Sequence, residues 1–113
     1  MSPVVPVRGH LDTMLLAVLG SGPDHGYAII DKLRLRSGGT FSMPEGSVYP
    51  ALHRLEHEGL VASHWAQVSG RCRRVYELTR GGHAQLGERR RAWTEFAAAV
   101  DAVLGDSKWP ASI

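Results

Sequence analysis

Three segments in the first half of the chain carry apolar residues at helical spacing. The first predicts a helix over about 10–20. The second predicts a helix that Asp24 caps and that Gly38 stops. The third predicts a helix from 45–47 to about 58, because Pro50 lacks an N–H group and fits best in a first turn. The apolar positions behind these three predictions are Leu11, Met14, Leu15, Val18 and Leu19; Tyr27, Ile30 and Leu33; and Val48, Leu52 and Leu55.

The second half of the chain predicts a β-hairpin followed by a long helix. Segments 60–68 and 73–78 are rich in strand-forming residues and flank a Ser69-Gly70 turn. Thr79 can cap a last helix that ends near 104. The apolar residues of this helix follow a spacing of seven, three, four and three, close to a coiled-coil seam, and they are Leu86, Trp93, Phe96, Val100 and Val103.

This order of elements predicts a mostly α-helical chain with a minor β component, a winged helix-turn-helix with a long C-terminal helix. The expected organisation is a lead-in at 1–9, a DNA-binding unit at 10–78, a dimerisation helix at 79–105 and a tail at 106–113. A second copy of the chain would bury the apolar seam of the last helix best. The alternative is that this helix folds back on its own core.

The composition is that of one globular domain, and its charge is unevenly spread. The chain has 113 residues, 43% of them hydrophobic, and a net charge of +2. Residues 71–91 alone hold seven basic and two acidic side chains, which indicates a polyanionic partner. A lone Cys72 favours a reducing cytoplasm, and no apolar run is long enough to span a membrane.

Double-stranded operator DNA is the partner that this arrangement predicts. The N-terminal residues of the third helix would meet base edges and phosphates, and the hairpin tip would bring cations to the backbone. We expect Arg54 to read a base and Arg74 to bind phosphate without sequence preference. The complete set of expected DNA contacts is Ser47, Tyr49, His53, Arg54, Arg71, Arg73 and Arg74.

Four segments resemble the PadR-like transcriptional regulators, in the shorter form with a single domain. They span roughly 10–100 and read Leu11-Asp12-Thr13-Met14-Leu15-Leu16; His25-Gly26-Tyr27; Gly46-Ser47-Val48-Tyr49-Pro50-Ala51-Leu52-His53-Arg54-Leu55-Glu56 with Gly59-Leu60; and Arg73-Arg74-Val75-Tyr76-Glu77-Leu78-Thr79. The stretch from Tyr49 to Glu56 is the most specific. One departure is the pair Gly81-Gly82, where the family usually has one glycine, and it leaves the start of the last helix open.

The resemblance implies a homodimeric repressor that releases its operator when it binds a small, often aromatic effector. The candidate effector contacts are Leu15, Trp93 and Phe96, where a flat ligand could stack on the indole ring. The alternative for the two aromatic residues is a purely structural place in the dimer core. The candidate dimer contacts are Leu86, Trp93, Phe96, Val100 and Val103.

Two alternatives use other chemistry. The segment from His53 to His57 matches H-x-x-E-H, in which two histidines one turn apart bind zinc in certain hydrolases, but a third protein ligand and a cleft are also required. Cys72 between two arginines, or the six histidines, could make the regulator responsive to redox state or metal. We expect no catalytic residue, no metal and no cofactor.

Overall fold

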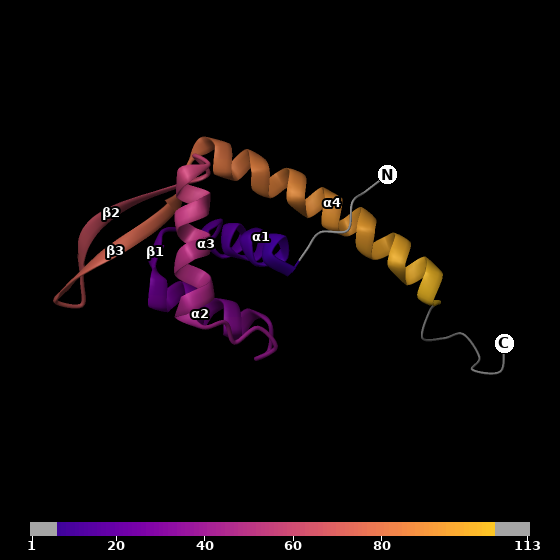
Figure 1. Cartoon of the computed structure of the whole chain (residues 1–113), viewed down its shortest axis with the longest axis horizontal. Coiled ribbons are helices and arrows are strands. Elements are labelled where there is room, and N and C mark those ends of the chain that lie inside the picture. Colours follow the sequence, from indigo (N-terminus) through magenta and orange to yellow (C-terminus); the bar gives the residue numbers. More distant parts are fainter. Residues whose placement is uncertain (1–6, 106–113) are drawn as a thin grey trace.

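The structure, a computed structural model, describes residues 7–105. Within this range four helices and three strands follow one another (Figure 1). Their bounds are α1 (Val7–Leu19), β1 (Asp24–His25), α2 (Gly26–Arg36), α3 (Glu45–His57), β2 (Val61–Val68), β3 (Arg71–Leu78) and α4 (Arg80–Leu104). The predicted winged helix-turn-helix with a long last helix is confirmed, and β1 is an addition to it.

Helix α1 begins earlier than the sequence pattern predicts. Its backbone is helical from Val7, so 7–9 belong to the helix rather than to a lead-in. Thr13 joins this first part by donating its hydroxyl to the carbonyl oxygen of Gly9 at 3.0 Å. The rest of the expected lead-in, 1–6, and the expected tail at 106–113 lie outside the described residues.

The hairpin forms where the sequence predicts it. Strands β2 and β3 pair in antiparallel register from Val61 opposite Leu78 to Val68 opposite Arg71. The turn residues Ser69 and Gly70 both have positive φ angles, 51° and 79°, the combination of a type I′ turn. This hairpin is the wing, and it extends away from the helices in Figure 1.

Strand β1 was not predicted, and it changes the start of α2. Asp24 and His25 pair with Tyr76 and Val75 of β3, which gives the strand order β1-β3-β2. The cap of α2 is therefore His25, whose Nδ1 accepts from the backbone N–H of Ala28 at 3.4 Å. The prediction that Asp24 is the cap is wrong, because Asp24 is taken up by the sheet. Two residues are too few to show an alternating pattern.

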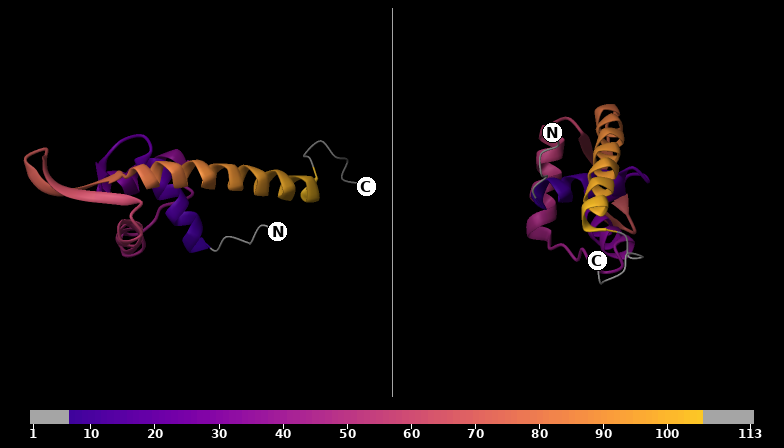
Figure 2. Two further views of the ribbon diagram at one scale, coloured as in Figure 1. Left: turned by 90° about the horizontal axis from the view of Figure 1, so that it is seen from above. Right: turned by 90° about the vertical axis from the view of Figure 1, so that its right-hand side faces the viewer.

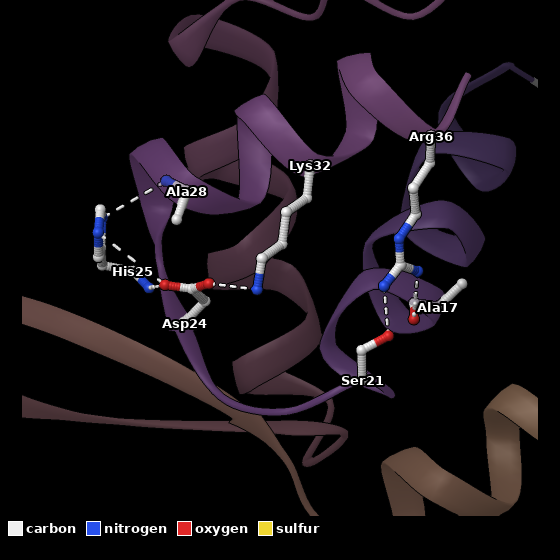
Figure 3. A network of polar contacts seen from close by, with 7 residues as sticks. All are labelled: Ala17, Ser21, Asp24, His25, Ala28, Lys32 and Arg36. Atoms are coloured by element: carbon white, nitrogen blue, oxygen red, sulfur yellow. Dashed lines mark hydrogen bonds and ion pairs between the residues drawn. The ribbon is translucent and has the colours of Figure 1, made fainter. Parts of the chain in front are cut away.

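Polar contacts hold the loop between α1 and α2 (Figure 3). The Asp24 carboxylate lies 2.5 Å from Lys32 Nζ and accepts from the His25 N–H at 2.9 Å. Burial on its own raises the pKa of Asp24, but these two contacts outweigh it and the pKa lies below its ordinary value. Arg36 reaches back from the end of α2 and donates to the Ala17 carbonyl oxygen and the Ser21 hydroxyl.

The buried face of α2 differs from the predicted one. Gly26, Ile29 and Leu33 line it at a spacing of three and four, whereas Tyr27 is 54% exposed. A Cβ on Gly26 would collide with the ring and hydroxyl of Tyr49, so this glycine lets α2 approach α3 closely. Because glycine carries no apolar side chain, the sequence pattern selected Tyr27 instead.

One hydrophobic core joins all four helices and the base of the hairpin. Two residues in it carried other expectations. Leu15 is completely buried among core side chains, and its contact with an effector stays a prediction. Leu86 is 3% exposed and lies where α4 crosses Gly20, so it belongs to the core of its own protomer rather than to a dimer interface. The core consists of Leu11, Leu15, Leu16, Val18, Leu19, Ile29, Leu33, Val48, Ala51, Leu52, Leu55, Val61, Tyr76, Leu78 and Leu86.

Helix α3 starts within the predicted window, but Pro50 does not lie in its first turn. The helix begins at Glu45, so Pro50 is its sixth residue. A proline there removes the hydrogen bond to the carbonyl oxygen four residues earlier, that of Gly46. Both Gly46 and Pro50 are exposed, so water can satisfy this carbonyl.

Helix α4 begins where Thr79 predicts. The Thr79 hydroxyl accepts from the N–H of Gly82 at 3.0 Å, which settles the start that the Gly81-Gly82 pair left open. Gly82 packs on the backbone of Leu60 so closely that a Cβ would collide with its carbonyl oxygen. From there α4 runs past the rest of the molecule, and its last turns extend beyond the other helices (Figures 1 and 2).

Candidate nucleic-acid interface

Helix α3 presents one face to the core and the opposite face to solvent. Val48, Ala51, Leu52 and Leu55 are completely buried. Glu45, Gly46, Pro50, His53 and His57 are exposed, and Ser47 is half-buried. The N-cap Pro44 makes no side-chain hydrogen bond to the helix. Free N–H groups at an exposed helix N-terminus are donors for phosphate and base acceptors.

The wing brings two of the three predicted arginines toward solvent or toward α2. Arg71 is exposed beside the turn, next to an exposed Cys72. The Arg73 guanidinium lies 5.6 Å above the ring of Tyr27, the exposed tyrosine of α2. The nearby Glu45 carboxylate raises the pKa of Tyr27. Tyr27 therefore joins the wing to the N-terminus of α3.

Arg74 differs from its neighbours because protein groups hold its guanidinium. Its Nε donates to the Ser63 hydroxyl at 2.9 Å, and Ser63 donates in turn to the Glu56 carboxylate at 2.6 Å. Arg74 Nη2 lies 3.8 Å from Glu56, and the guanidinium lies 5.4 Å above the Trp65 ring. Arg74 is therefore not an unpaired cation in this structure, and its contact with phosphate stays a prediction.

Arg54 also has a protein partner. Its Nη2 donates to Asp12 Oδ1 of α1 at 2.9 Å. The Asp12 side chain is 12% exposed and that of Arg54 is 29% exposed, so the pair is mostly enclosed. The Arg54 guanidinium is directed to α1 in this structure, and the base-reading role of Arg54 stays a prediction.

Tyr49 lies between α2 and α3 rather than pointing away from the protein. It is half-buried, and its hydroxyl and ring edge abut Gly26. Burial and the nearby Glu45 carboxylate raise the pKa of Tyr49, so the phenol stays protonated at neutral pH. We expected the hydroxyl to project toward DNA, and the structure corrects its direction.

The H-x-x-E-H segment does not gather a metal site. His53 and His57 share an exposed face of α3 with Pro50 and Glu58, but Glu56 points to Ser63 of the wing. Within residues 7–105, no three His, Cys, Asp or Glu side chains come together as metal ligands.

The outer half of α4 carries an uncovered apolar stripe. Trp93 is 50% exposed and Val103 86% exposed. Two aromatic neighbours flank Trp93: the ring of His10 on α1 stands edge-on at 5.4 Å, and Phe96 lies at 5.8 Å. The predicted contacts Trp93, Phe96, Val100 and Val103 therefore follow one side of α4. Leu86 lies seven residues before Trp93 on the same side, but it is buried in the core.

Comparison with known proteins decides the family. The sequence model of the Transcriptional regulator PadR-like family matches residues 15–88. The chain belongs to this PadR-like family. A transcriptional regulator of Mycobacterium tuberculosis is 48% identical over 60 residues, which are 53% of this chain and 56% of that protein.

Solved structures of PadR-like regulators share the fold. One from Bacillus cereus is 30% identical with a TM-score of 0.78, over 89% of this chain and 97% of its own. One from Clostridium difficile is 29% identical with a TM-score of 0.76, over 86% of this chain and 100% of its own. This PadR-like chain is thus a transcriptional regulator with a DNA-binding winged helix. No helix in the described part is apolar and long enough to cross a membrane.

Sequence reasoning missed four residues of this PadR-like site; three lie far along the chain from their partners, and the fourth, Trp65, lies opposite Arg74 in the hairpin. Tyr27 contacts Arg73, Asp12 contacts Arg54, and Glu56 and Trp65 both contact Arg74. A signal was present for Glu56, since it belongs to the most specific stretch of the resemblance. No short-range pattern identifies the partner in an ion pair such as Asp12–Arg54, whose residues are 42 apart along the chain.

The Asp12–Arg54 pair gives a prediction about stability. We expect Asp12→Ala to lower the free energy of unfolding by about 1–3 kcal/mol, because it leaves an enclosed guanidinium without its acceptor. The double variant Asp12→Leu/Arg54→Met should recover much of the loss, since an apolar pair needs no desolvated charge. Urea unfolding followed by circular dichroism measures both. If Arg54→Ala were fully stable and lost the preference for the operator, this result would favour a base-reading role for Arg54 over a structural one.

Proposed function

We propose that this PadR-like regulator is a homodimeric repressor that binds operator DNA through the N-terminus of α3 and the wing. The observation that carries this proposal is the meeting of Glu45, Tyr27 and Arg73. These residues come from α3, α2 and β3. A helix N-terminus and a cationic wing on one side of a domain can enter a major groove and contact the flanking phosphates together.

The proposed contacts fall into two groups. Ser47 and His53 lie on or beside the outward face of α3 and would meet base edges or phosphates. Tyr49 supports this helix from behind, with its hydroxyl against Gly26 of α2. Arg71 and Arg73 would bind phosphates, which adds affinity for any sequence.

The preference of the protein for its operator over other DNA sequences tests this function. A genome-wide binding experiment identifies the operator, and its affinity is compared with that of a shuffled duplex at equal salt. The proposal expects the operator to bind at least about 10³-fold more tightly. Arg71→Ala should weaken both duplexes alike, whereas His53→Ala should reduce their ratio. Equal affinity of the unmodified protein for the two duplexes would refute sequence-specific regulation.

We propose that a second copy of the chain covers the outer stripe of α4. Support comes from the exposure of Val100, Val103 and Leu104, 36%, 86% and 77%, on a helix that leaves its own core after Leu86. Burying such side chains is worth about 25 cal/mol for each Å² removed from water. A two-fold dimer would read two half-sites one DNA turn, or a multiple of it, apart.

The aromatic cluster around Trp93 is the proposed effector site. Its indole is half-exposed and is flanked by His10 and Phe96, so a planar aromatic ligand could stack there. We expect phenolic acids or planar drugs to quench tryptophan fluorescence and to release operator DNA. Trp93→Leu should abolish the quenching. Quenching that persists undiminished in this variant would place the ligand elsewhere.

A further inference from the structure

The outer half of the wing has few apolar contacts to fix its direction. At its base, Val61, Tyr76 and Leu78 are buried in the core. From Trp65 to Cys72 no residue is buried, and Trp65 is 64% exposed. A two-stranded ribbon with both faces in solvent is only marginally stable by itself. Its direction relative to α3 therefore depends on the polar contacts that leave it.

One such contact runs from the wing to α3. Arg74 Nε donates to Ser63, Ser63 donates to Glu56, and Arg74 Nη2 faces the same carboxylate. Glu56 lies on α3, Ser63 on β2 and Arg74 on β3, so the network joins both strands to the proposed recognition helix. Trp65 packs on the guanidinium and limits its movement, as a cation–π contact does.

We infer that Glu56 and Arg74 are positioning residues that set the direction of the wing relative to α3. In this role Arg74 acts on DNA through Glu56, and it places Arg71 and Arg73 at the phosphates. The inference rests on the proposed function, because it requires wing arginines that contact DNA. It departs from the expectation that each wing arginine is an independent phosphate ligand.

The direction in which one substitution changes the affinity for DNA separates a positioning role from a purely electrostatic one. Glu56→Gln and Glu58→Gln each remove one negative charge near the end of α3. If charge alone matters, both variants should bind a polyanion slightly more tightly. Glu58 is exposed and has no ion pair among the described residues, so it is the matched control. Positioning predicts that Glu56→Gln binds more weakly despite its more favourable charge.

The deciding measurement is the slope of log K, where K is the association constant for DNA, against the logarithm of the salt concentration. Each phosphate contact contributes about −0.9 to this slope and about eightfold in affinity at about 0.1 M salt. If Glu56→Gln displaces the wing so that one phosphate is lost per protomer, a dimer should show a slope shallower by about 1.8. A variant that is merely less stable has fewer active molecules but keeps the slope of those that bind.

The experiment measures binding of the full chain to one operator duplex over a range of salt, with circular dichroism to establish folding. We expect shallower slopes for Glu56→Gln, Ser63→Ala and Arg74→Lys, and the wild-type slope for Glu58→Gln. Arg74→Lys keeps the charge but loses the Nε donor. A wild-type slope for Arg74→Lys, or equal slopes for the two glutamate variants, would overturn the inference. Failure of the unmodified protein to bind DNA would instead refute the proposed function.

Discussion

Gly82→Ala is expected to destabilise the folded chain by about 1–3 kcal/mol or more, the range for forcing atoms into a filled space. The added methyl group would lie 3.1 Å from the Leu60 carbonyl carbon and would collide with its oxygen. That oxygen also accepts from the Thr79 N–H at 3.1 Å, so the backbone cannot easily give way. The base of the wing and the start of α4 would have to separate. Urea unfolding of the full chain measures the loss.

The neighbouring Gly81→Ala is the matched control. A Cβ there would meet its nearest atoms at 3.7 Å, in ordinary contact. Alanine restricts the unfolded chain and favours helix, so this variant should gain about 0.4–1 kcal/mol. The two adjacent substitutions should therefore have opposite signs. Equal stabilisation by both would mean that α4 does not pack on Leu60 as described.

Val100→Glu is expected to convert the protein into a folded monomer with much weaker operator binding. Val100 lies on the stripe of α4 and is 36% exposed within its own protomer, so a carboxylate is tolerated there in a monomer but would be buried in the proposed dimer. An unpaired charge in that interface prevents association. Losing the second half-site should reduce operator affinity by about 10²–10⁴-fold, the usual gain from linked binding.

Ala102→Glu supplies the control for charge. It adds the same carboxylate two residues further on, which is the opposite side of a helix with 3.6 residues per turn, and Ala102 is exposed. We expect this variant to remain dimeric by sedimentation and to bind the operator nearly as wild type. If Val100→Glu also remained dimeric, the stripe would not be the interface.

The sequence predicted the parts of the fold that follow short-range patterns. The helices came from apolar spacing, the cap of α4 from Thr79, and the hairpin from strand-forming residues around the Ser69-Gly70 turn, because each signal lies within a few residues. Strand β1 was not predicted, because its two residues are too few to show an alternating pattern. The face of α2 was misassigned at Tyr27, because the close approach at Gly26 leaves no apolar signal.

The site was predicted less completely, because charge alone does not show which cations are already paired. Ser47 and His53 follow from the face that Val48 and Leu52 leave free. Arg54 and Arg74 looked equivalent to the other cations, yet Asp12 and Glu56 hold them. Those acidic partners lie 42 and 18 residues away along the chain, and only the folded backbone brings them together.

The salt dependence of binding to the operator tests the central claim most directly. If Arg71 and Arg73 of both protomers contact phosphates, four contacts should give a slope of log K against log salt of about −3.6 or steeper. Replacing both arginines by alanine should remove that part of the slope. A slope near zero for the unmodified protein would contradict a wing and helix that bind DNA.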